Sequence, residues 1–252
     1  MIDEEDTLEG QIVLVTGAAK RIGRAVAQAL SDEGVGVVVP YRSSREEAEA
    51  LVAELTGGGA RAWAVQADLS DPSSAAGLIE RASGAARAPV DILINSAGIF
   101  APSGVLDFSA DDLAANLRVN AFAPLLLSRA LAAQGGTGQI VNFLDARMVE
   151  NDREHAAYHL SKRMLFTLTR MLALELAPRI RVNAVAPGLI LPPPGQDEPY
   201  LQRMADTVPL KRHGGPRDVV RSVLFLLKSE FITGQVIYVD GGRNLKGRMY
   251  GG

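Results

Sequence analysis

A tyrosine and a lysine four residues apart are suited, in type and spacing, to proton transfer. Tyr158 and Lys162 stand at the start of a stretch whose apolar residues recur with helical spacing. Side chains four residues apart share one face of a helix, so the phenol and the ammonium would point into one cleft. A nearby cation favours phenolate and lowers the tyrosine pKa from its usual value of about 10. The pair therefore predicts an acid for the reduction of a carbonyl or an imine, although this spacing is also common by chance.

A glycine-containing turn follows the first apolar run, at residues 16–23 (Thr-Gly-Ala-Ala-Lys-Arg-Ile-Gly). Glycine has no Cβ, so backbone at Gly17 and Gly23 can come close to a pyrophosphate. The helix that follows offers free N–H groups and the positive end of its dipole. Any tight strand-to-helix connection can use a glycine. Its place at the first such junction of the chain is what predicts a dinucleotide site.

The end of the second strand indicates which dinucleotide is bound. The sequence there is Tyr41-Arg42-Ser43, with an arginine and no acidic residue. An NAD enzyme usually has a carboxylate at this place for the ribose 2′-OH, whereas an NADP enzyme has a cation for the 2′-phosphate. A guanidinium and a neighbouring hydroxyl therefore favour NADP(H). The alternative is that Arg42 is an ordinary surface arginine.

The elements that would position these residues alternate along the chain. Strands are expected at residues 11–16, 36–40, 61–66, 90–94, 139–144, 180–186 and 236–239, and helices at 21–33, 44–55 and 73–85. Apolar runs without in/out alternation are typical of parallel strands covered on both faces. The pattern predicts an α/β fold: a single Rossmann-type domain with a doubly wound, seven-stranded parallel sheet flanked by helices.

The ends and loops complete this organisation. Residues 1–10 carry five acidic side chains and no apolar run, so we expect a solvated acidic leader before an NADP-binding reductase domain at residues 11–252. The three glycines at residues 57–59 predict the end of a helix. Residues 191–200, with four prolines, are expected to be irregular. Such a stretch is either a lid over the substrate or an ordinary surface connection.

Composition excludes several classes of function. The net charge of −3 gives no reason to expect a nucleic-acid partner, and no apolar run is long enough to span a membrane. The chain has no cysteine, which excludes disulfides and thiolate catalysis and fits a cytoplasmic protein. No metal site is expected, because His155, His159 and His213 lack metal-ligand spacing. We expect the first two on the helix surface near the mouth of the site and the third in a loop.

Together these motifs resemble the short-chain dehydrogenases/reductases over nearly the whole chain. The resemblance rests on the glycine turn, on residues 95–98 (Asn-Ser-Ala-Gly) and on the Tyr158/Lys162 pair. It implies that Asn120 supports a proton-relay water beside the lysine. It also implies a cofactor site made of Gly17, Arg21, Ile22, Gly23, Tyr41, Arg42, Ser43, Asp68, Leu69, Asn95, Ala97, Gly98, Tyr158, Lys162, Pro187 and Gly188. Members of this family are usually homotetramers.

Two departures from the family pattern resemble its pteridine reductases in particular. Arg21 replaces the usual middle glycine of the turn, and Asp145 replaces the usual serine thirteen residues before the tyrosine. Phe100 stands where those enzymes place the aromatic ring that sandwiches the pterin against the nicotinamide. Gly98 and Ile99, however, replace a pair of serines found in the closest of them.

Asp145, Arg21 and Phe100 all suit a pterin substrate. A serine hydroxyl donates to a carbonyl oxygen, whereas an ionised carboxylate only accepts hydrogen bonds. Pterins present amino and ring N–H groups, so an acceptor at Asp145 is useful. Each residue also has a simpler interpretation. Asp145 can be a structural carboxylate in a decayed site, Arg21 can merely neutralise the pyrophosphate, and Phe100 can pack in the core.

The sequence thus predicts an NADPH-dependent reductase of a pterin or dihydropterin, dihydrofolate included. The expected catalytic residues are Tyr158, Lys162, Asp145 and Asn120, and the expected substrate contacts are Arg21, Phe100, Asp145 and Tyr158. One alternative is a carbonyl reductase of the same family, acting on a ketone, a 3-oxoacyl thioester or a quinone. The other is an NADP-binding sensor or scaffold without turnover.

Overall fold

The computed structural model describes residues 7–149, 153–193 and 195–245. The strands are β1 (Ile12–Thr16), β2 (Gly36–Tyr41), β3 (Ala62–Gln66), β4 (Ile92–Asn95), β5 (Gly138–Phe143), β6 (Ile180–Pro187) and β7 (Val236–Val239). The helices are α1 (Arg21–Asp32), α2 (Arg45–Gly57), α3 (Pro72–Ala76), α4 (Leu78–Ala86), α5 (Ala110–Leu117), α6 (Ala123–Ala133), α7 (Ala156–Leu176), α8 (Glu198–Ala205) and α9 (Pro216–Lys228). The short helices Ala146–Val149 and Arg243–Leu245 are 3₁₀ turns.

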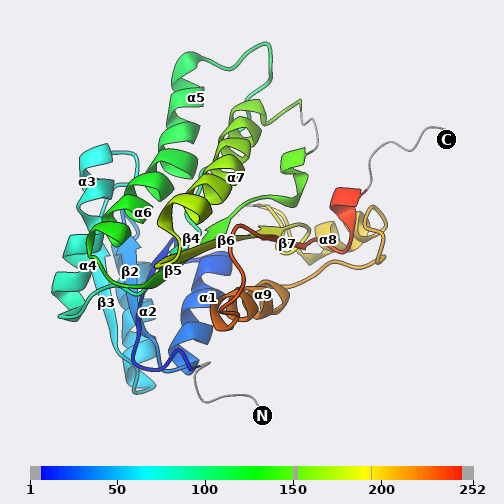
Figure 1. Ribbon diagram of the computed structural model, residues 1–252. Coiled ribbons are helices and arrows are strands. Elements are labelled where there is room, and N and C mark those ends of the chain that lie inside the picture. Colours follow the sequence, from blue (N-terminus) through cyan, green and yellow to red (C-terminus); the bar gives the residue numbers. More distant parts are fainter. Residues whose placement is uncertain (1–6, 150–152, 194, 246–252) are drawn as a thin grey trace.

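The seven strands form one parallel sheet in the order β3-β2-β1-β4-β5-β6-β7 (Figure 1). The chain therefore winds outward from β1 to β3 and then returns to continue from β4 to β7. This confirms the predicted single α/β domain with a doubly wound sheet. In such sheets, ligands bind at the carboxyl ends of the strands, where the winding reverses between β1 and β4.

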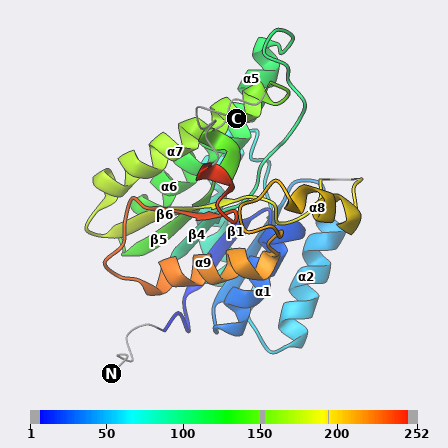
Figure 2. The same cartoon turned by 90° about the vertical axis from the view of Figure 1, so that its right-hand side faces the viewer.

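Helices cover the two faces of the sheet (Figure 2). Alternate residues of β1 point to opposite faces, because successive side chains of a strand do so. Val13 and Val15 pack in a cluster with residues of α1, α2 and α9. Ile12 and Leu14 pack in a second cluster with residues of α4, α6 and α7. The unbroken apolar strands noted in the sequence follow from this double burial.

Most element boundaries fall within one or two residues of those predicted, and two regions differ more. The helix expected at residues 73–85 is divided at Gly77, which ends α3 and precedes α4. The irregular stretch expected up to residue 200 ends earlier, because α8 begins at Glu198 after Asp197. The predicted turn at residues 57–59 is confirmed, with α2 ending at Gly57 and Gly59 at a φ of +89°.

The start of the chain is partly folded into the domain. Residues 1–6 of the expected leader lie outside the described residues, as do residues 246–252 of the expected reductase domain. Leu8 is only 2% exposed and packs in the α1 side of the core, and the Gly10 N–H donates to the Gly34 carbonyl. Leu8 is therefore an exception to the expected solvated leader, whereas Thr7, Glu9 and Gly10 are exposed. Within the described ranges, no helix is both long and apolar enough to cross a membrane.

Candidate active site at the carboxyl edge of the sheet

Parallel strands bring the predicted site residues to one edge of the sheet. Thr16 at the end of β1 pairs in register with Asn95 at the end of β4, which pairs with Asn142 near the end of β5. The turns that follow these strands, and those after β2 and β6, therefore open at the same edge. The residues expected to bind cofactor and substrate lie at the ends of these strands, on the turns that follow them, in the first turn of α1 and in the first two turns of α7. Asp68 and Leu69 follow β3.

The glycine turn packs tightly against the turn that follows β4. Gly17 has a φ of +71°, and a Cβ there would lie 3.0 Å from the Ala97 Cα. A Cβ on Gly23 would collide with the Gly17 carbonyl. Thr16 joins the two turns, since its Oγ1 accepts the N–H groups of Ser96 and Ala97 at 3.0 Å each. Both glycines are thus required by the close approach of the protein's own backbone, and their approach to a pyrophosphate stays a prediction.

Arg21 occupies a backbone conformation that usually belongs to glycine. Its φ is +56°, and a left-handed conformation costs a non-glycine residue roughly 1–2 kcal/mol. The guanidinium Nη2 donates to the Pro192 carbonyl at 2.7 Å. Arg21 therefore ties the glycine turn to the proline-rich stretch after β6. That stretch lies beside the expected cofactor turn.

The end of β2 presents its polar side chains to solvent. Arg42 and Ser43 are exposed, and Tyr41 is half-buried. Asp68, after the neighbouring strand β3, accepts hydrogen bonds from the Ser70 hydroxyl at 2.6 Å and the Ser70 N–H at 2.8 Å. These bonds lower the pKa of Asp68, with a smaller contribution from the charge of Arg42. A cation and a carboxylate therefore lie near each other beyond the ends of β2 and β3.

The other expected cofactor residues follow the same edge. They are Ile22 and Gly23 in the first turn of α1, Leu69 after β3, Asn95, Ala97 and Gly98 at and after the end of β4, and Pro187 and Gly188 at and after the end of β6. The Asn95 side chain points into the core, where its amide donates to the Asn142 side chain at 2.8 Å. Gly188 packs against Asp240, whose Cβ would lie 2.6 Å from a Cβ at 188.

Tyr158 and Asp145 are joined directly. The Tyr158 hydroxyl donates to Asp145 Oδ2 at 2.9 Å, and Asp145 Oδ1 accepts the Arg147 N–H at 2.6 Å. Tyr158 is 8% exposed, in the first turn of α7. Asp145 lies between β5 and the 3₁₀ turn Ala146–Val149. The carboxylate therefore stands where its lone pairs can accept hydrogen bonds from the phenol and from any N–H group presented beside it.

The expected lowering of the Tyr158 pKa is wrong for this arrangement. Burial raises the pKa of Tyr158 well above 10, and the charge and hydrogen bond of Asp145 raise it further, while Arg147 opposes them weakly. Lys162, the cation from which the lowering was expected, has its Nζ 5.8 Å from the centre of the phenol ring. The phenol is therefore firmly protonated, which is the form a proton donor needs.

Lys162 is buried beneath the tyrosine. Its Nζ donates to the Phe143 carbonyl at 2.7 Å. Burial lowers its pKa from 10.5 to about 8, and the charge of Asp145 opposes this shift. The lysine is thus a cation near neutral pH whose charge is lost in mildly alkaline solution.

Asn120 lies in a π-helical turn, Arg118–Phe122, between α5 and α6. Its Oδ1 accepts the Ile99 N–H at 2.9 Å, and its Nδ2 donates to the Ile99 carbonyl and to Ser161 Oγ at 3.0 Å each. A Cβ on Gly98 would lie 3.2 Å from Asn120 Oδ1 and 3.7 Å from Lys162 Nζ. Gly98 thus adjoins both polar groups, and the structure brings the predicted asparagine and lysine together. π-Helical turns often mark functional sites.

Phe100 is not a core residue, because it is 46% exposed. Its ring stacks on His155 with centroids 4.0 Å apart, and it meets the Tyr158 ring edge-on at 4.7 Å. His159 is 5% exposed and packs edge-on against Tyr158, so its expected place on the helix surface is wrong. His213 lies in a loop as predicted, with Nε2 2.9 Å from a Glu198 carboxylate oxygen. No cluster of three potential metal ligands is found among the described residues.

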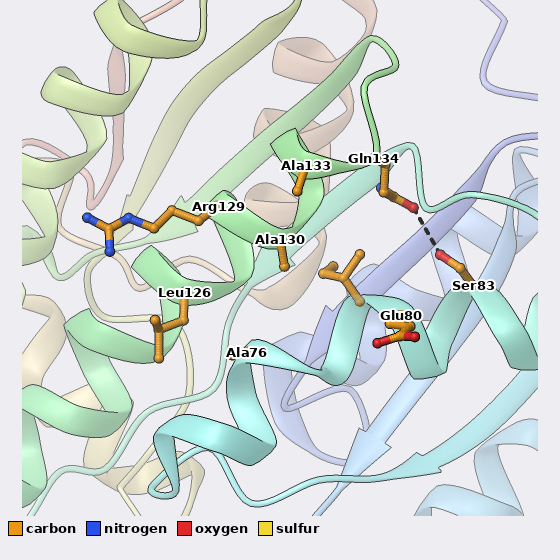
Figure 3. Close-up of a pocket in the computed structure, with 9 residues that line it drawn as sticks. Ala76, Glu80, Ser83, Leu126, Arg129, Ala130, Ala133 and Gln134 are labelled. Carbon is orange, nitrogen blue, oxygen red and sulfur yellow. Dashed lines mark hydrogen bonds between the residues drawn. The ribbon is translucent and has the colours of Figure 1, made fainter.

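A separate groove of about 600 Å³ lies between the α3–α4 region and α6 (Figure 3). It is lined by Ala76, Ile79, Glu80, Ser83, Leu126, Arg129, Ala130, Ala133 and Gln134. The Ser83 hydroxyl donates to the Gln134 side chain across one end. The groove contains none of the residues that the sequence singles out, and it is not part of the candidate active site.

Comparison with known proteins agrees with this geometry. A family profile described as enoyl-(acyl carrier protein) reductase matches residues 17–244. The chain belongs to the short-chain dehydrogenase/reductase family. This membership accounts for the glycine turn, the turn after β4 and the Tyr158/Lys162 pair occurring in one chain.

Relatives of this short-chain dehydrogenase/reductase span nearly its whole length. It is 35% identical to a chloroplastic NADPH-dependent aldehyde reductase-like protein of Arabidopsis thaliana, over 93% of this chain and 94% of the relative. It is also 35% identical to a 3-oxoacyl-[acyl-carrier-protein] reductase of Synechocystis, over 93% and 97% of the two chains. Among solved structures, FolM alternative dihydrofolate reductase 1 from Brucella canis, complexed with NADP, aligns with a TM-score of 0.91. The two are 33% identical over 98% of this chain and 99% of that one.

Proposed function

We propose that this protein is an NADPH-dependent reductase of a C=N bond in a pterin or dihydropterin, dihydrofolate included. The observation that carries the proposal is the hydrogen bond between Tyr158 and the carboxylate of Asp145. In a carbonyl reductase of this family, a serine hydroxyl at position 145 would donate to the substrate oxygen. Here the group next to the proton donor accepts hydrogen bonds, which suits a substrate rich in N–H groups.

NADP(H) is the proposed cofactor, and it supplies the hydride. The glycine turn leads into α1, whose N-terminus would offer free N–H groups and the positive end of its dipole to a pyrophosphate. Arg42 and Ser43 are exposed where the 2′-phosphate would lie. The complex of the Brucella canis protein with NADP supports this choice, as does the NADPH dependence of the Arabidopsis relative. Arg21 would reach the phosphates and the substrate from the same turn.

Tyr158 is the proposed proton donor to the ring nitrogen. Asp145 holds the phenol oxygen in place, since the hydroxyl donates to Asp145 Oδ2. Lys162 lies close enough for its charge to stabilise the phenolate that forms when the proton leaves. Asn120, beside Gly98 and the lysine, would hold the water that restores the proton. Phe100, exposed at the edge of the tyrosine, would stack on the heterocycle.

A carbonyl reductase is the second candidate. The names of the Arabidopsis and Synechocystis relatives favour it, whereas the name of the Brucella canis neighbour, a dihydrofolate reductase, favours the first. The buried, hydrogen-bonded set of Tyr158, Lys162 and Asn120 argues against a sensor without turnover, because a protein that only binds cofactor has no use for it.

We also propose a homotetramer. Met171 and Leu174 expose apolar side chains on α7, the helix that carries Tyr158. Their burial between subunits would remove an apolar surface from water. Sedimentation of the purified protein tests the assembly: a monomer across the micromolar range would contradict it. A cytoplasmic location stays a prediction.

The proposed activity is tested by NADPH oxidation against dihydrobiopterin, dihydrofolate and a panel of ketones. The wild type and Asp145→Ser are compared, because the variant restores the usual serine of the family. We expect the wild type to reduce the pterins and the variant to gain ketone reduction while losing pterin turnover. Reduction of ketones alone by the wild type would reject the pterin assignment. Binding of NADPH without turnover of any substrate would favour the sensor.

A further inference from the structure

The segment after β4 docks on the start of α7 through Ser103. The Ser103 N–H donates to the Glu154 carbonyl at 2.6 Å, and the Ala156 N–H donates to the Ser103 carbonyl at 2.8 Å. The two segments thereby form an isolated parallel bridge between Ser103 and His155. Backbone far from the sheet is thus paired in the manner of a strand, which fixes the relative register of the two segments.

The Ser103 side chain also caps the helix. The first N–H groups of a helix have no acceptor within it and are usually satisfied by the residue just before the helix. His155, at that position, provides no side-chain cap for α7. Ser103 Oγ accepts the Ala157 N–H at 3.1 Å instead, and Ser103 is only 6% exposed. The cap therefore comes from a residue 54 positions earlier in the chain.

Both connected segments carry residues of the proposed site. Phe100 lies three residues before Ser103 and stacks on His155, the partner of Ser103 in the bridge. Tyr158 directly follows Ala157, whose N–H Ser103 accepts, and its ring meets the edge of Phe100. Ser103 thus stands where the segment that carries Phe100 and the start of α7 are hydrogen-bonded to each other at Glu154, Ala156 and Ala157.

We propose that Ser103 is a positioning residue that sets the location of Tyr158 relative to Phe100. This inference rests on the proposed function for the roles of Tyr158 and Phe100. The backbone bonds of Ser103 survive any substitution except proline, so the hydroxyl is what a mutation tests. Without it the first turn of α7 loses an acceptor at Ala157, and the phenol has more freedom relative to the substrate ring. Small displacements of a reacting group lower the rate of the chemical step more than they lower binding.

The test compares Ser103→Ala and Ser103→Thr with Ser109→Ala as a matched control. Ser109 likewise caps a helix, α5, by accepting the Asp112 N–H. For Ser103→Ala we expect kcat to fall about tenfold with the Kd of NADPH unchanged, and hydrogen exchange to accelerate in a peptide covering residues 154–160. Threonine keeps the hydroxyl, so kcat should stay within about twofold of the wild type. Ser109→Ala should lower the melting temperature without changing kcat.

Three results would bear on whether Ser103 positions Tyr158. An unchanged kcat in Ser103→Ala, with faster exchange at residues 154–160, would show that the cap is only structural and overturn the proposal. If Ser103→Ala does not fold, Ser103→Cys keeps the volume with a poorer acceptor, and wild-type kcat in that variant would overturn it equally. If the wild type reduces ketones and not pterins, the proposed function fails. The ratio of kcat between Ser103→Ala and wild type on the ketone then tests Ser103 independently.

Discussion

The two ends of the candidate site are built in different ways. At the cofactor end, Arg42 and Ser43 are exposed at the end of β2, and their placement depends on the turn that carries them. At the chemical end, Tyr158 and Lys162 are buried and already hydrogen-bonded to Asp145 and to the Phe143 carbonyl. Folding therefore positions the proposed reacting groups before any ligand arrives, whereas the proposed phosphate-binding groups are left in water.

This difference follows from what each end must do. Attraction between a guanidinium and a phosphate acts over several ångströms and tolerates some motion. Proton transfer requires donor and acceptor within hydrogen-bonding distance. A site of this kind should lose turnover when the chemical end is altered, and cofactor affinity and selectivity when the other end is altered. Substitutions at the two ends test that separation.

The largest effect is expected from Tyr158→Phe. The variant keeps the ring that packs against Phe100 and His159 but removes the hydroxyl that donates to Asp145. A general acid contributes typically 10²–10⁴-fold, so kcat should fall by roughly a thousandfold. The Kd of NADPH, measured by the change in its fluorescence on binding, should change little.

A second tyrosine serves as the matched control for this variant. Tyr238→Phe removes the same atom from a half-buried tyrosine in the edge strand β7, and kcat should be unchanged. Turnover by Tyr158→Phe at the wild-type rate would remove the proton-donor assignment. A large loss of NADPH affinity in that variant would instead show that the chemical end also determines cofactor affinity.

Arg42→Ala should lower the affinity for NADPH and leave kcat nearly unchanged, the reverse of Tyr158→Phe. A hydrogen bond to a charged group is worth about 1.5–3 kcal/mol, so NADPH affinity should fall by roughly 10- to 100-fold. NADH lacks the 2′-phosphate, so its affinity should hardly change. Because Arg42 is exposed, the wild-type preference for NADPH should also weaken as salt is added. The turnover of bound NADPH should remain close to that of the wild type.

Arg61→Ala is the control for net charge. Arg61 is exposed at the opposite end of the sheet, just before β3, and its Nη2 donates to the Gly10 carbonyl. Its loss should leave the ratio of NADPH to NADH affinity unchanged. An equal loss of affinity for both dinucleotides in Arg42→Ala would contradict the 2′-phosphate contact.

The same contrast separates what the sequence could predict from what it could not. The sheet, its seven parallel strands and the turns at its carboxyl edge follow from local patterns: apolar runs, glycines at junctions and helical spacing. Helical spacing placed Tyr158 and Lys162 together, and the family resemblance added Asn120, which the structure brings beside them. The division of a predicted helix at Gly77 was missed, because a single glycine in a helical pattern is usually tolerated.

The errors at the chemical end arise from contacts between distant segments. Ser103 was missed because the N–H group it accepts belongs to Ala157, 54 residues later in the chain, and a local sequence pattern does not predict a contact between such distant residues. His159 was placed on the surface because helical spacing alone does not show which faces of α7 are covered. The Tyr158 pKa was predicted in the wrong direction, because burial and the charge of Asp145 raise it and burial depends on the whole fold.

The smallest predicted effect is a displacement of the pH profile by Asp145→Asn. Lys162 has a pKa of about 8, so its stabilising charge is lost as the pH rises through that value, and wild-type kcat should decline there. The phenol does not produce this decline, since its pKa lies well above 10. The negative charge of Asp145 raises the pKa of Lys162. Removing it should therefore move the alkaline decline to lower pH.

Asp206→Asn controls for a general loss of negative charge, because Asp206 is an exposed carboxylate after α8. Its profile should coincide with that of the wild type. Asparagine at 145 keeps an oxygen that can accept the Tyr158 hydroxyl, so a shifted profile isolates the charge from the hydrogen bond. A decline at the wild-type position in Asp145→Asn would mean that the carboxylate does not act on the lysine. Asp145 would then contact the other proposed catalytic residues only through its hydrogen bond with the Tyr158 hydroxyl. Its charge would act on the substrate and not on the pKa of Lys162.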